Sequence, residues 1–343
     1  MNVAIRVDGS VNLGLGNVHR SLVLAEALKS EGHEVCFIMR GFPEAFETIK
    51  EKGYPIFLLS PSIYNGALNA QISEILAQSD IQMVINDIKD TDAAYMQHLK
   101  QSGVWSVNFD DLGSGRGLAD VLFDAFYSGK TEAERENFGP KFVVLRNEFL
   151  KKGHETKKKT KNGEVRSIAV LMGATNAGGL LERVMKALKR LPETIECHIV
   201  LSRSTPRAEV FQMDYPEKNF VYHHNPDNIA EIFAEADLAI TAGGLAMCET
   251  CSVGTPTLVI PQVPHEAHNA ALFEKSGAVS ALPYDPDISE QKIFEQLQVL
   301  IQDVKARKVL EKKSRQLIDG QGLFRVLQVL KPLLENPAKI AEN

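Results

Sequence analysis

The turns Gly14-Leu15-Gly16-Asn17 and Ala242-Gly243-Gly244-Leu245 decide the fold of this chain, because each follows an apolar strand and opens a helix in opposite halves of the sequence. A helix N-terminus offers unpaired backbone N–H groups and a partial positive charge, and glycine lets a ligand approach the backbone closely. Each turn is therefore predicted to seat an anion or a phosphate. The duplication predicts two domains with a cleft between them, and a phosphorylated sugar or a nucleotide as the ligand.

Short β-branched runs alternate with amphipathic stretches outward from both turns. Strands separated by helical patterns are typical of βαβ units, so each half is predicted to form a parallel sheet. A polar, lysine-rich segment at 151–163 interrupts the alternation, and the second series is predicted to form a new sheet. The predicted strands are 3–7, 35–39, 56–59, 83–85 and 105–109 in the first half, and 168–172, 198–201, 220–222, 238–240 and 256–260 in the second.

The chain of 343 residues is longer than one hydrophobic core usually supports, so about two domains of roughly 150 residues are expected. We expect an N-terminal Rossmann-like domain at 1–150, on the sugar or acceptor side, and a second at 167–320, on the nucleotide side. Residues 151–166 are the expected linker. The helical spacing of apolar residues in 288–334 predicts two or three closing helices, and the last, within 321–343, is expected to pack back on the N-terminal domain.

The composition is that of an ordinary globular protein, with 44% hydrophobic and 24% charged residues. A formal net charge of −6 argues against nucleic-acid binding, because phosphates are neutralised by clustered Lys and Arg. The segment 151–163 is therefore interpreted as a solvated linker, with an RNA-binding or membrane-surface patch as the weaker alternative. Met1 leads directly into an apolar strand and no stretch approaches about 20 apolar residues, so we expect a cytoplasmic protein without an integral membrane segment.

The four cysteines are too few and too scattered for a disulfide framework. Cys248 and Cys251 form a CxxC pattern, but no second pair completes a zinc site, and they are expected to pack within a helix.

In the first half, the candidate residues follow the first strand. Gly14 and Gly16 lack the third glycine of the GxGxxG fingerprint, which disfavours a nicotinamide cofactor. Asn17 and the backbone of Gly16 are expected to face a sugar or phosphate, with Arg20 supporting the loop and Asp8 orienting a neighbouring group. The alternative is that Asp8 caps and the glycines only turn the chain.

In the second half, the turn at Gly173 carries Thr175 and Asn176, whose hydroxyl and amide suit phosphate oxygens. An ordinary capped turn explains these residues equally well. The stronger case is Gly243-Gly244-Leu245, where Glu249 follows about a turn and a half into the helix. Glu249 could accept both hydroxyls of a ribose while the helix start faces the pyrophosphate.

The segment from Pro261 also follows an apolar strand, and it carries two histidines and a glutamate. His265 and His268 lack the i, i+4 spacing of HExxH, and the prolines are expected to hold the segment in a loop. We therefore expect His265, Glu266, His268 and Asn269 to contact a sugar or phosphate and not a metal. No cofactor is expected, and no carboxylate cluster is placed as a magnesium seat.

With these motifs, the chain resembles the two-domain nucleotide-sugar enzymes of GT-B fold. It looks most similar to the UDP-sugar hydrolase of pseudaminic acid biosynthesis and to spore-coat polysaccharide biosynthesis proteins. The resemblance implies two Rossmann-like, doubly wound domains facing a central cleft, with a UDP-sugar as substrate. The loop 265–269 is also similar to that of the N-acetylglucosamine transferase acting on the lipid-linked peptidoglycan precursor. The matching segments are Arg6 to Ser10, Gly14 to Gly16, Arg20 to Leu22, Gly139 to Phe149, the turn at Gly173, Ala242 to Gly244 with Glu249, Gly254 to Pro256, and Asp319 to Gly322.

The chain departs from the hydrolase pattern at one position. The family's GxGH histidine, expected to activate water, is Asn17 here, and a general base typically contributes about 10²–10⁴ in rate. Hydrolysis of a UDP-sugar at the anomeric carbon to free sugar and UDP is our first expectation, with Asp8, His265 or His268 as the base. A glycosyltransferase with a UDP-sugar donor is the alternative, and a non-catalytic nucleotide-sugar-binding protein is the second. The sequence has no heptad or exposed apolar stripe that predicts an oligomeric state.

Overall fold

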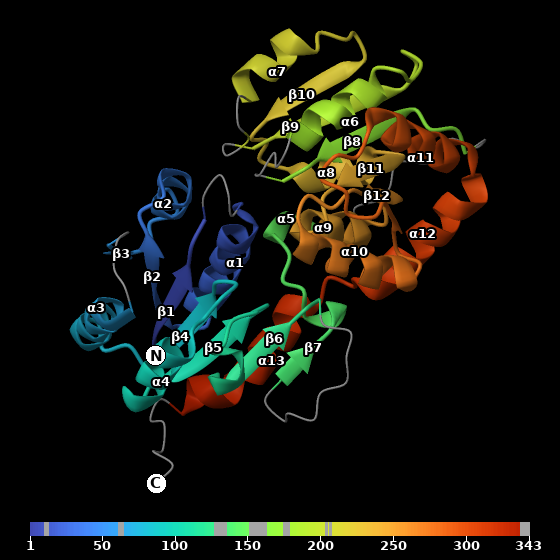
Figure 1. Ribbon diagram of the computed structural model, residues 1–343. Helices are drawn as coiled ribbons and strands as arrows, with labels where there is room; N and C mark the ends of the chain where they lie inside the picture. Colours follow the sequence, from blue (N-terminus) through green and yellow to red (C-terminus); the bar gives the residue numbers. More distant parts are fainter. Residues whose placement is uncertain are drawn as a thin grey trace. The chain divides into compact units, whose positions relative to one another are not determined.

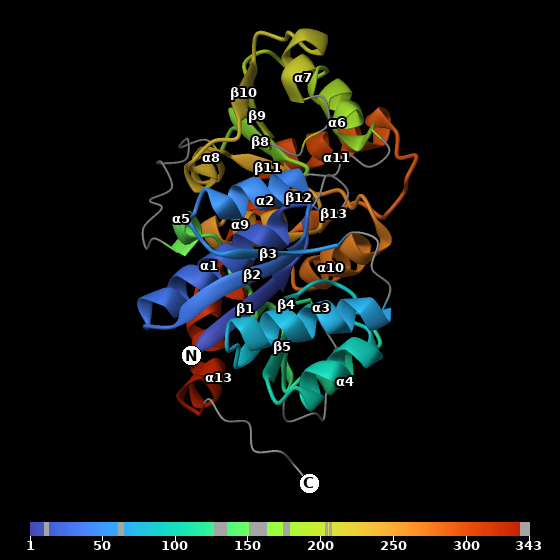
Figure 2. The same cartoon turned by 90° about the vertical axis from the view of Figure 1, so that its left-hand side faces the viewer.

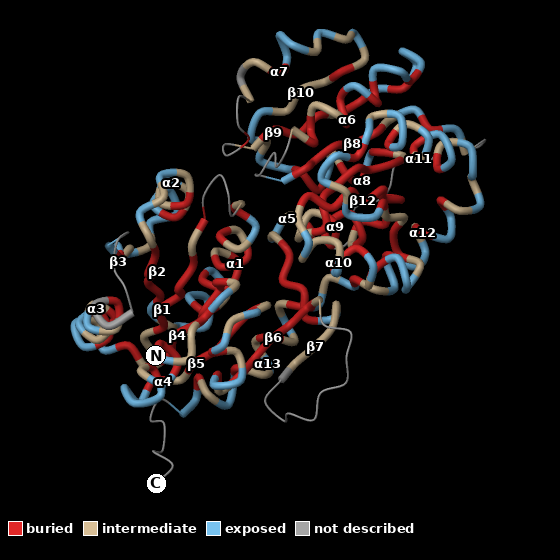
Figure 3. Tube along the Cα trace, viewed as in Figure 1, coloured by how far each residue is buried: buried red, intermediate tan, exposed pale blue. Residues whose placement is uncertain are grey.

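The computed structural model describes residues 1–9, 14–60, 65–126, 136–150, 163–173, 179–202, 205 and 208–336. The chain divides into two compact units (Figure 1). The first unit contains Met1–Val144 and the C-terminal segment from Gln321, and the second unit contains Leu145–Gly320. In each unit the strands are buried at the centre and the outer helix faces are exposed (Figure 3).

Within its described residues, the first unit has a seven-stranded parallel sheet in the order β3-β2-β1-β4-β5-β6-β7. All five strands predicted in this half are confirmed. Two further strands at the edge, β6 and β7, were not predicted, because only a short 3₁₀ turn at Arg116–Leu118 separates β5 from β6 and the helical spacing of βαβ units is missing. The strands are β1 Asn2–Val7, β2 Glu34–Arg40, β3 Ile56–Leu59, β4 Met83–Asp87, β5 Trp105–Phe109, β6 Val121–Asp124 and β7 Glu136–Phe138.

Helices cover both faces of this sheet. Successive side chains of a strand point to opposite faces, and here the side chains on both faces are apolar and buried. Val3 and Ile5 of β1 pack in the core that holds side chains of α1 (Gly16–Ser30), α2 (Pro43–Lys50) and α13 (Gly322–Glu335). Ala4 packs in the opposite core with α3 and α4. Helices α3 (Asn65–Gln78) and α4 (Ala93–Gln101) lie together on that face in Figure 2.

The last helix, α13, packs on the first unit. Its residues Val326, Leu330 and Leu334 are buried in the same core as β1. The Arg325 guanidinium donates to the Lys141 carbonyl at 3.0 Å, and the Trp105 indole N–H donates to the Asn336 carbonyl at 3.0 Å. The chain therefore returns to its first sheet after completing the second.

The second unit has, within its described residues, a six-stranded parallel sheet in the order β10-β9-β8-β11-β12-β13. The five predicted strands and the prediction of a separate second sheet are confirmed; the two-residue edge strand β13 was not predicted. The strands are β8 Ser167–Leu171, β9 Glu196–Leu201, β10 Phe220–His224, β11 Leu238–Thr241, β12 Thr257–Val259 and β13 Ser280–Ala281.

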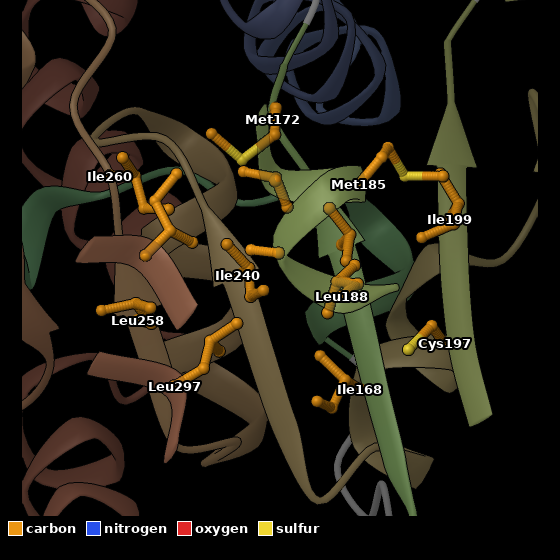
Figure 4. Close-up of a cluster of buried hydrophobic side chains, with 14 of the residues drawn as sticks. Ile168, Met172, Met185, Leu188, Cys197, Ile199, Ile240, Leu258, Ile260 and Leu297 are labelled. Atoms are coloured by element: carbon orange, nitrogen blue, oxygen red, sulfur yellow. The ribbon is translucent and has the colours of Figure 1, made fainter. Parts of the chain in front are cut away.

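One face of the second sheet packs on α6 (Leu180–Leu188) and α11 (Glu290–Gln302), through a cluster that includes Met185, Leu188 and Leu297 (Figure 4). Helices α8 (Ile229–Glu235) and α9 (Leu245–Val253) contact the sheet through β8, β11 and β12. Cys248 and Cys251 are buried in α9 and form no disulfide, as expected for cysteines that pack a helix. The remaining helices are α5 Asn147–Leu150, α7 Ala208–Asp214, α10 Pro264–Lys275 and α12 Val304–Leu317.

The strand order reverses once in each sheet, between β1 and β4 and between β8 and β11. In doubly wound sheets, ligands bind outside the carboxyl ends of the strands at such a switch point. Gly14 follows β1, Gly173 follows β8 and Gly243 follows β11. The predicted glycine turns therefore lie at the carboxyl ends of strands that flank the switch points. No helix of the described ranges is long and apolar enough to cross a membrane.

We expect a histidine pair on β9 and β10 to make the stability of the second unit depend on pH. His198 Nδ1 lies 3.0 Å from His223 Nε2, and burial together with the neighbouring His198 lowers the pKa of His223. Because the unfolded chain then binds a proton at a higher pH than the folded chain does, the free energy of unfolding is expected to fall as the pH drops below about 6.5.

Urea unfolding at pH 7.5 and 5.5 checks this expectation. His223→Gln should reduce the loss of stability between the two pH values, whereas the control His224→Gln, at the exposed neighbouring position, should not. An equal loss in the wild type and His223→Gln would contradict the assignment.

Candidate functional site

Three turns of the second unit are tied together at the carboxyl ends of β8, β11 and β12. The Gln262 side-chain amide donates to the Met172 carbonyl, which links the turn after β12 to the turn after β8. Asn269 Nδ2 donates to the Gly243 carbonyl at 3.0 Å, which links α10 to the turn after β11. The predicted residues Gly173, Gly243, Gly244, Glu266 and Asn269 therefore share one edge of the sheet.

Helix α10 begins at Pro264, so the prediction that prolines hold this segment in a loop is wrong. Proline is favoured in the first turn of a helix, because its φ is already helical and its missing N–H would have no intrahelical partner. His265, Glu266, His268 and Asn269 consequently lie in the first turns of α10. His265 is half-buried, and His268 is exposed.

The two glycines of the turn before α9 have different surroundings. A Cβ on Gly243 would lie 2.4 Å from the Glu266 carbonyl oxygen, so the close packing of α10 requires glycine there. A Cβ on Gly244 would lie 3.7 Å from Glu266 Oε1, an ordinary contact. Gly244 is the N-cap of α9 and supplies no side-chain cap, and Leu245, the first residue of α9, is half-buried. The N-terminus of α9 can therefore receive a ligand oxyanion.

Glu249 is buried, with 5% of its surface exposed. Both carboxylate oxygens accept hydrogen bonds from Arg146, at 2.6 Å from Nε and 2.7 Å from Nη2. Burial is the largest single influence and by itself lowers the pKa of Arg146, but the charge and hydrogen bonds of Glu249 and the charge of Glu148 together raise it above its usual value. A carboxylate oxygen has two lone pairs, so Glu249 keeps capacity to accept from a ligand hydroxyl while Arg146 holds it.

Arg146 joins three helices of the second unit. It precedes α5 and pairs with Glu249 of α9, and its Nη1 lies 3.5 Å from Glu148 Oε1. The same Glu148 oxygen accepts from the Ile229 N–H at the start of α8, at 3.1 Å. Arg146 therefore fixes the position of Glu249 relative to α5 and α8.

In the first unit, the predicted residues follow β1. Asn17 is half-buried, and its side-chain nitrogen donates to the Asp87 carbonyl at 3.3 Å, across the switch point. Asp8 Oδ1 accepts from the Arg40 N–H at the end of β2, at 2.8 Å. Gly14 has a φ of +79°, in the left-handed region that favours glycine, and Gly16 starts α1 and is exposed.

Arg20 belongs to an internal ion-pair network. Its guanidinium binds both carboxylate oxygens of Asp87 and one oxygen of Asp110, and only 3% of Arg20 is exposed. Burial by itself lowers the pKa of Arg20. The charges and hydrogen bonds of Asp87 and Asp110 together raise it by more, so the pKa lies above its usual value. Asp110 has a φ of +46°, uncommon for a non-glycine residue. Arg20 thus fixes the carboxyl ends of β4 and β5, whereas the loop that it is expected to support, at 10–13, lies outside the described residues.

Several of these residues had no predicted role. The chain fold alone brings these residues close to the candidate sites; they are Arg146, Gln262, Asp87 and Asp110. Arg146, for example, is 103 positions from Glu249 in the sequence. Thr175 and Asn176, and most of the lysine-rich segment, lie outside the described residues. In the described part of the chain, no group of three or more His, Cys, Asp or Glu side chains is arranged to hold a metal ion.

Gly243→Ala and Gly244→Ala form a matched pair. The new methyl group at 243 meets backbone that cannot move freely, so Gly243→Ala should lower the free energy of unfolding by about 1–3 kcal/mol. Gly244→Ala should change it much less. Urea unfolding of both variants checks this, and equal losses would contradict the close packing of Gly243 on α10.

Arg146→Met should strongly destabilise the second unit. It leaves the buried Glu249 carboxylate without its partner, and breaking a buried pair typically costs about 3–5 kcal/mol. The double variant Arg146→Met with Glu249→Leu should recover most of the loss, because it removes the unpaired charge as well. A double-mutant cycle from thermal unfolding measures this, and additive losses would argue against the pairing.

Comparisons with known proteins agree with this geometry. Residues 167–321 match the family model of the glycosyltransferase family 28 C-terminal domain. The chain is 25% identical to the spore coat polysaccharide biosynthesis protein SpsG of Bacillus subtilis (strain 168), over 98% of this chain and 99% of SpsG. It is 22% identical to a UDP-N-acetylglucosamine--N-acetylmuramyl-(pentapeptide) pyrophosphoryl-undecaprenol N-acetylglucosamine transferase of Finegoldia magna, over 51% of this chain and 50% of that relative.

The crystal structure of Acinetobacter baumannii MurG superimposes with a TM-score of 0.68 at 16% sequence identity, over 96% of this chain and 99% of MurG. The chain therefore has the two-domain GT-B fold of glycosyltransferase structures, and its second unit is similar to the C-terminal domain of glycosyltransferase family 28.

Proposed function

We propose that this protein is a glycosyltransferase-like enzyme that uses a UDP-sugar in the biosynthesis of a surface polysaccharide. The observation that carries the proposal is the edge of the second unit, where a glycine turn opens α9 and the buried Glu249 follows on the same helix. The similarity to SpsG supports the polysaccharide, and the similarity to the Finegoldia magna transferase supports the UDP-sugar donor.

In this proposal, the second unit binds the nucleotide. The pyrophosphate accepts hydrogen bonds from the N–H groups at the start of α9, where Gly244 leaves room for its oxygens. Glu249 lies four residues after Leu245, on the same side of the helix, and accepts from the ribose hydroxyls. Arg146 holds the Glu249 carboxylate in its orientation through two hydrogen bonds. Gly173, with Thr175 and Asn176, would add phosphate contacts.

Transfer is favoured over hydrolysis by the residue at position 17. An asparagine side chain does not take up a proton near neutral pH, and the Asn17 amide nitrogen already donates to the Asp87 carbonyl. In transfer, the leaving diphosphate can itself take the proton of the acceptor hydroxyl. Hydrolysis by the mechanism of the similar hydrolases, in which a histidine at this position activates water, would need another base here, and the proposed alternatives are Asp8, His265 and His268.

The test combines UDP binding with turnover. Calorimetry should detect UDP binding to the wild type, and Glu249→Gln should weaken it about ten- to a hundred-fold, as for loss of a charge-assisted hydrogen bond. Glu193→Gln, at an exposed position in the same unit, is the control. Unchanged UDP affinity in Glu249→Gln would refute the proposed nucleotide site.

Chromatography of UDP released from UDP-N-acetylglucosamine without an acceptor then separates the activities. We expect binding with little release, as for a transferase without its acceptor. Release together with free sugar would instead establish hydrolysis despite Asn17. A gain of cleavage in Asn17→His would identify a hydrolase site that lacks its base.

A further inference from the structure

Arg6 carries a buried positive charge that the described residues leave without a carboxylate. It is the fifth residue of β1, and 3% of its surface is exposed. Within the described ranges, its buried Nε has no hydrogen-bond partner and its guanidinium forms no ion pair with a carboxylate. Burying a charge without a partner costs folding free energy, so such a charge in a folded protein points to a function, such as binding a ligand of opposite charge.

The Arg6 guanidinium contacts a neutral side chain, Tyr95, through the aromatic ring and through a hydrogen bond to the Tyr95 hydroxyl. The Arg6 guanidinium carbon lies 4.8 Å from the centre of the Tyr95 ring, in the geometry of a cation–π contact. Asp8, two residues further along β1, uses Oδ1 to accept from the Arg40 N–H. Tyr95 supports the guanidinium from one side but supplies no negative charge.

A hydrogen-bonded chain holds Tyr95 in place. Its hydroxyl donates to Asn86 Oδ1 at 2.7 Å, Asn86 Nδ2 donates to Asn108 Oδ1 at 2.8 Å, and Asn108 Nδ2 donates to Asp111 Oδ2 at 2.7 Å. Asn86 is the register partner of Arg6 on β4, and Asn108 is the next one on β5. These groups are bonded to one another, so they orient the Tyr95 ring without neutralising Arg6.

Arg20 provides the internal comparison. Arg20 also lies at the carboxyl edge of this sheet, but its guanidinium forms ion pairs with Asp87 and Asp110. The undescribed stretches that follow β1 and β3, at 10–13 and 61–64, contain no acidic residue. The stretch 127–135, which has two glutamates, follows β6, which is about 14 Å from β1 across the sheet. Of the two buried arginines in the described part of the first unit, Arg20 is paired with carboxylates and Arg6 is not.

We propose that Arg6 binds an oxyanion, a carboxylate or phosphate group carried by a ligand of the first unit. Arg6 is the next-to-last residue of β1, which flanks the switch point where ligands of such sheets bind. Its guanidinium can give two parallel hydrogen bonds to such a group, and the Tyr95 platform already orients it. The inference rests on the proposed function and extends it, because it gives the ligand of the first unit a negative charge.

The first measurement is the stability of the ligand-free protein. Arg6→Met removes an uncompensated buried charge and keeps most of the apolar stem, so its thermal unfolding midpoint should equal or exceed that of the wild type. A structural role for Arg6 predicts the opposite. Arg40→Met, at the end of the neighbouring strand β2 and half-buried, is the control. A clear loss of stability in Arg6→Met alone would overturn the proposal.

The second measurement is anion binding, with saturating UDP present to fill the nucleotide site and ionic strength held constant. Inorganic phosphate or glucuronate should raise the unfolding midpoint of the wild type. Arg6→Met should bind the effective anion about ten- to a hundred-fold more weakly, and Arg6→Lys should fall between the two. An effect of phosphate alone identifies a phosphate group, and an effect of glucuronate alone identifies a carboxylate.

The outcomes separate this inference from the proposed function. If UDP binds in a Glu249-dependent manner but Arg6→Met retains the wild-type response to both anions, or the wild type responds to neither, Arg6 is not an oxyanion site. If the anion response depends on Arg6 while UDP does not bind, the oxyanion site stands and the nucleotide-sugar function fails.

Discussion

A parallel sheet brings the carboxyl ends of all its strands to one edge, and the two candidate sites of this protein depend on that constraint. In the second unit, the turns after β8, β11 and β12 meet there and are joined through Gln262 and Asn269. In the first unit, the residues after β1 meet the end of β4 through Asn17 and Asp87. Residues far apart in the sequence become neighbours because their strands are adjacent and point the same way.

Buried ion pairs fix the positions of carboxylate side chains at these edges. Arg146 holds Glu249, and Arg20 holds Asp87 and Asp110. Such pairs add little net stability, because removing both charges from water costs nearly as much as their attraction gains. Their value lies in geometry, since a bidentate arginine fixes both the position and the orientation of a carboxylate. Arg6 differs because its partner is not a carboxylate of the described chain.

The GT-B fold and the proposed chemistry rest on different observations. The fold follows from the two doubly wound sheets and from the superposition on MurG. Our proposal of transfer rests on one side chain, Asn17, because an amide is not an effective base near neutral pH. A shared fold permits both reactions, so the proposed function is argued from the site residues.

The sequence by itself determined the two sheets and the glycine turns, because both are local patterns of apolar spacing and of residues that allow close approach. Even so, the sequence patterns missed the edge strands β6, β7 and β13, which lack a preceding helix or sufficient length. The patterns also predicted a loop where α10 begins, because proline was taken as a residue that holds a loop, although it also begins helices. Only the tertiary structure decided that Glu249 pairs with Arg146, that Arg20 pairs with Asp87 and Asp110, and that Arg6 has no carboxylate partner among the described residues. Those facts depend on which strands and helices become neighbours, and no spacing in the sequence records that.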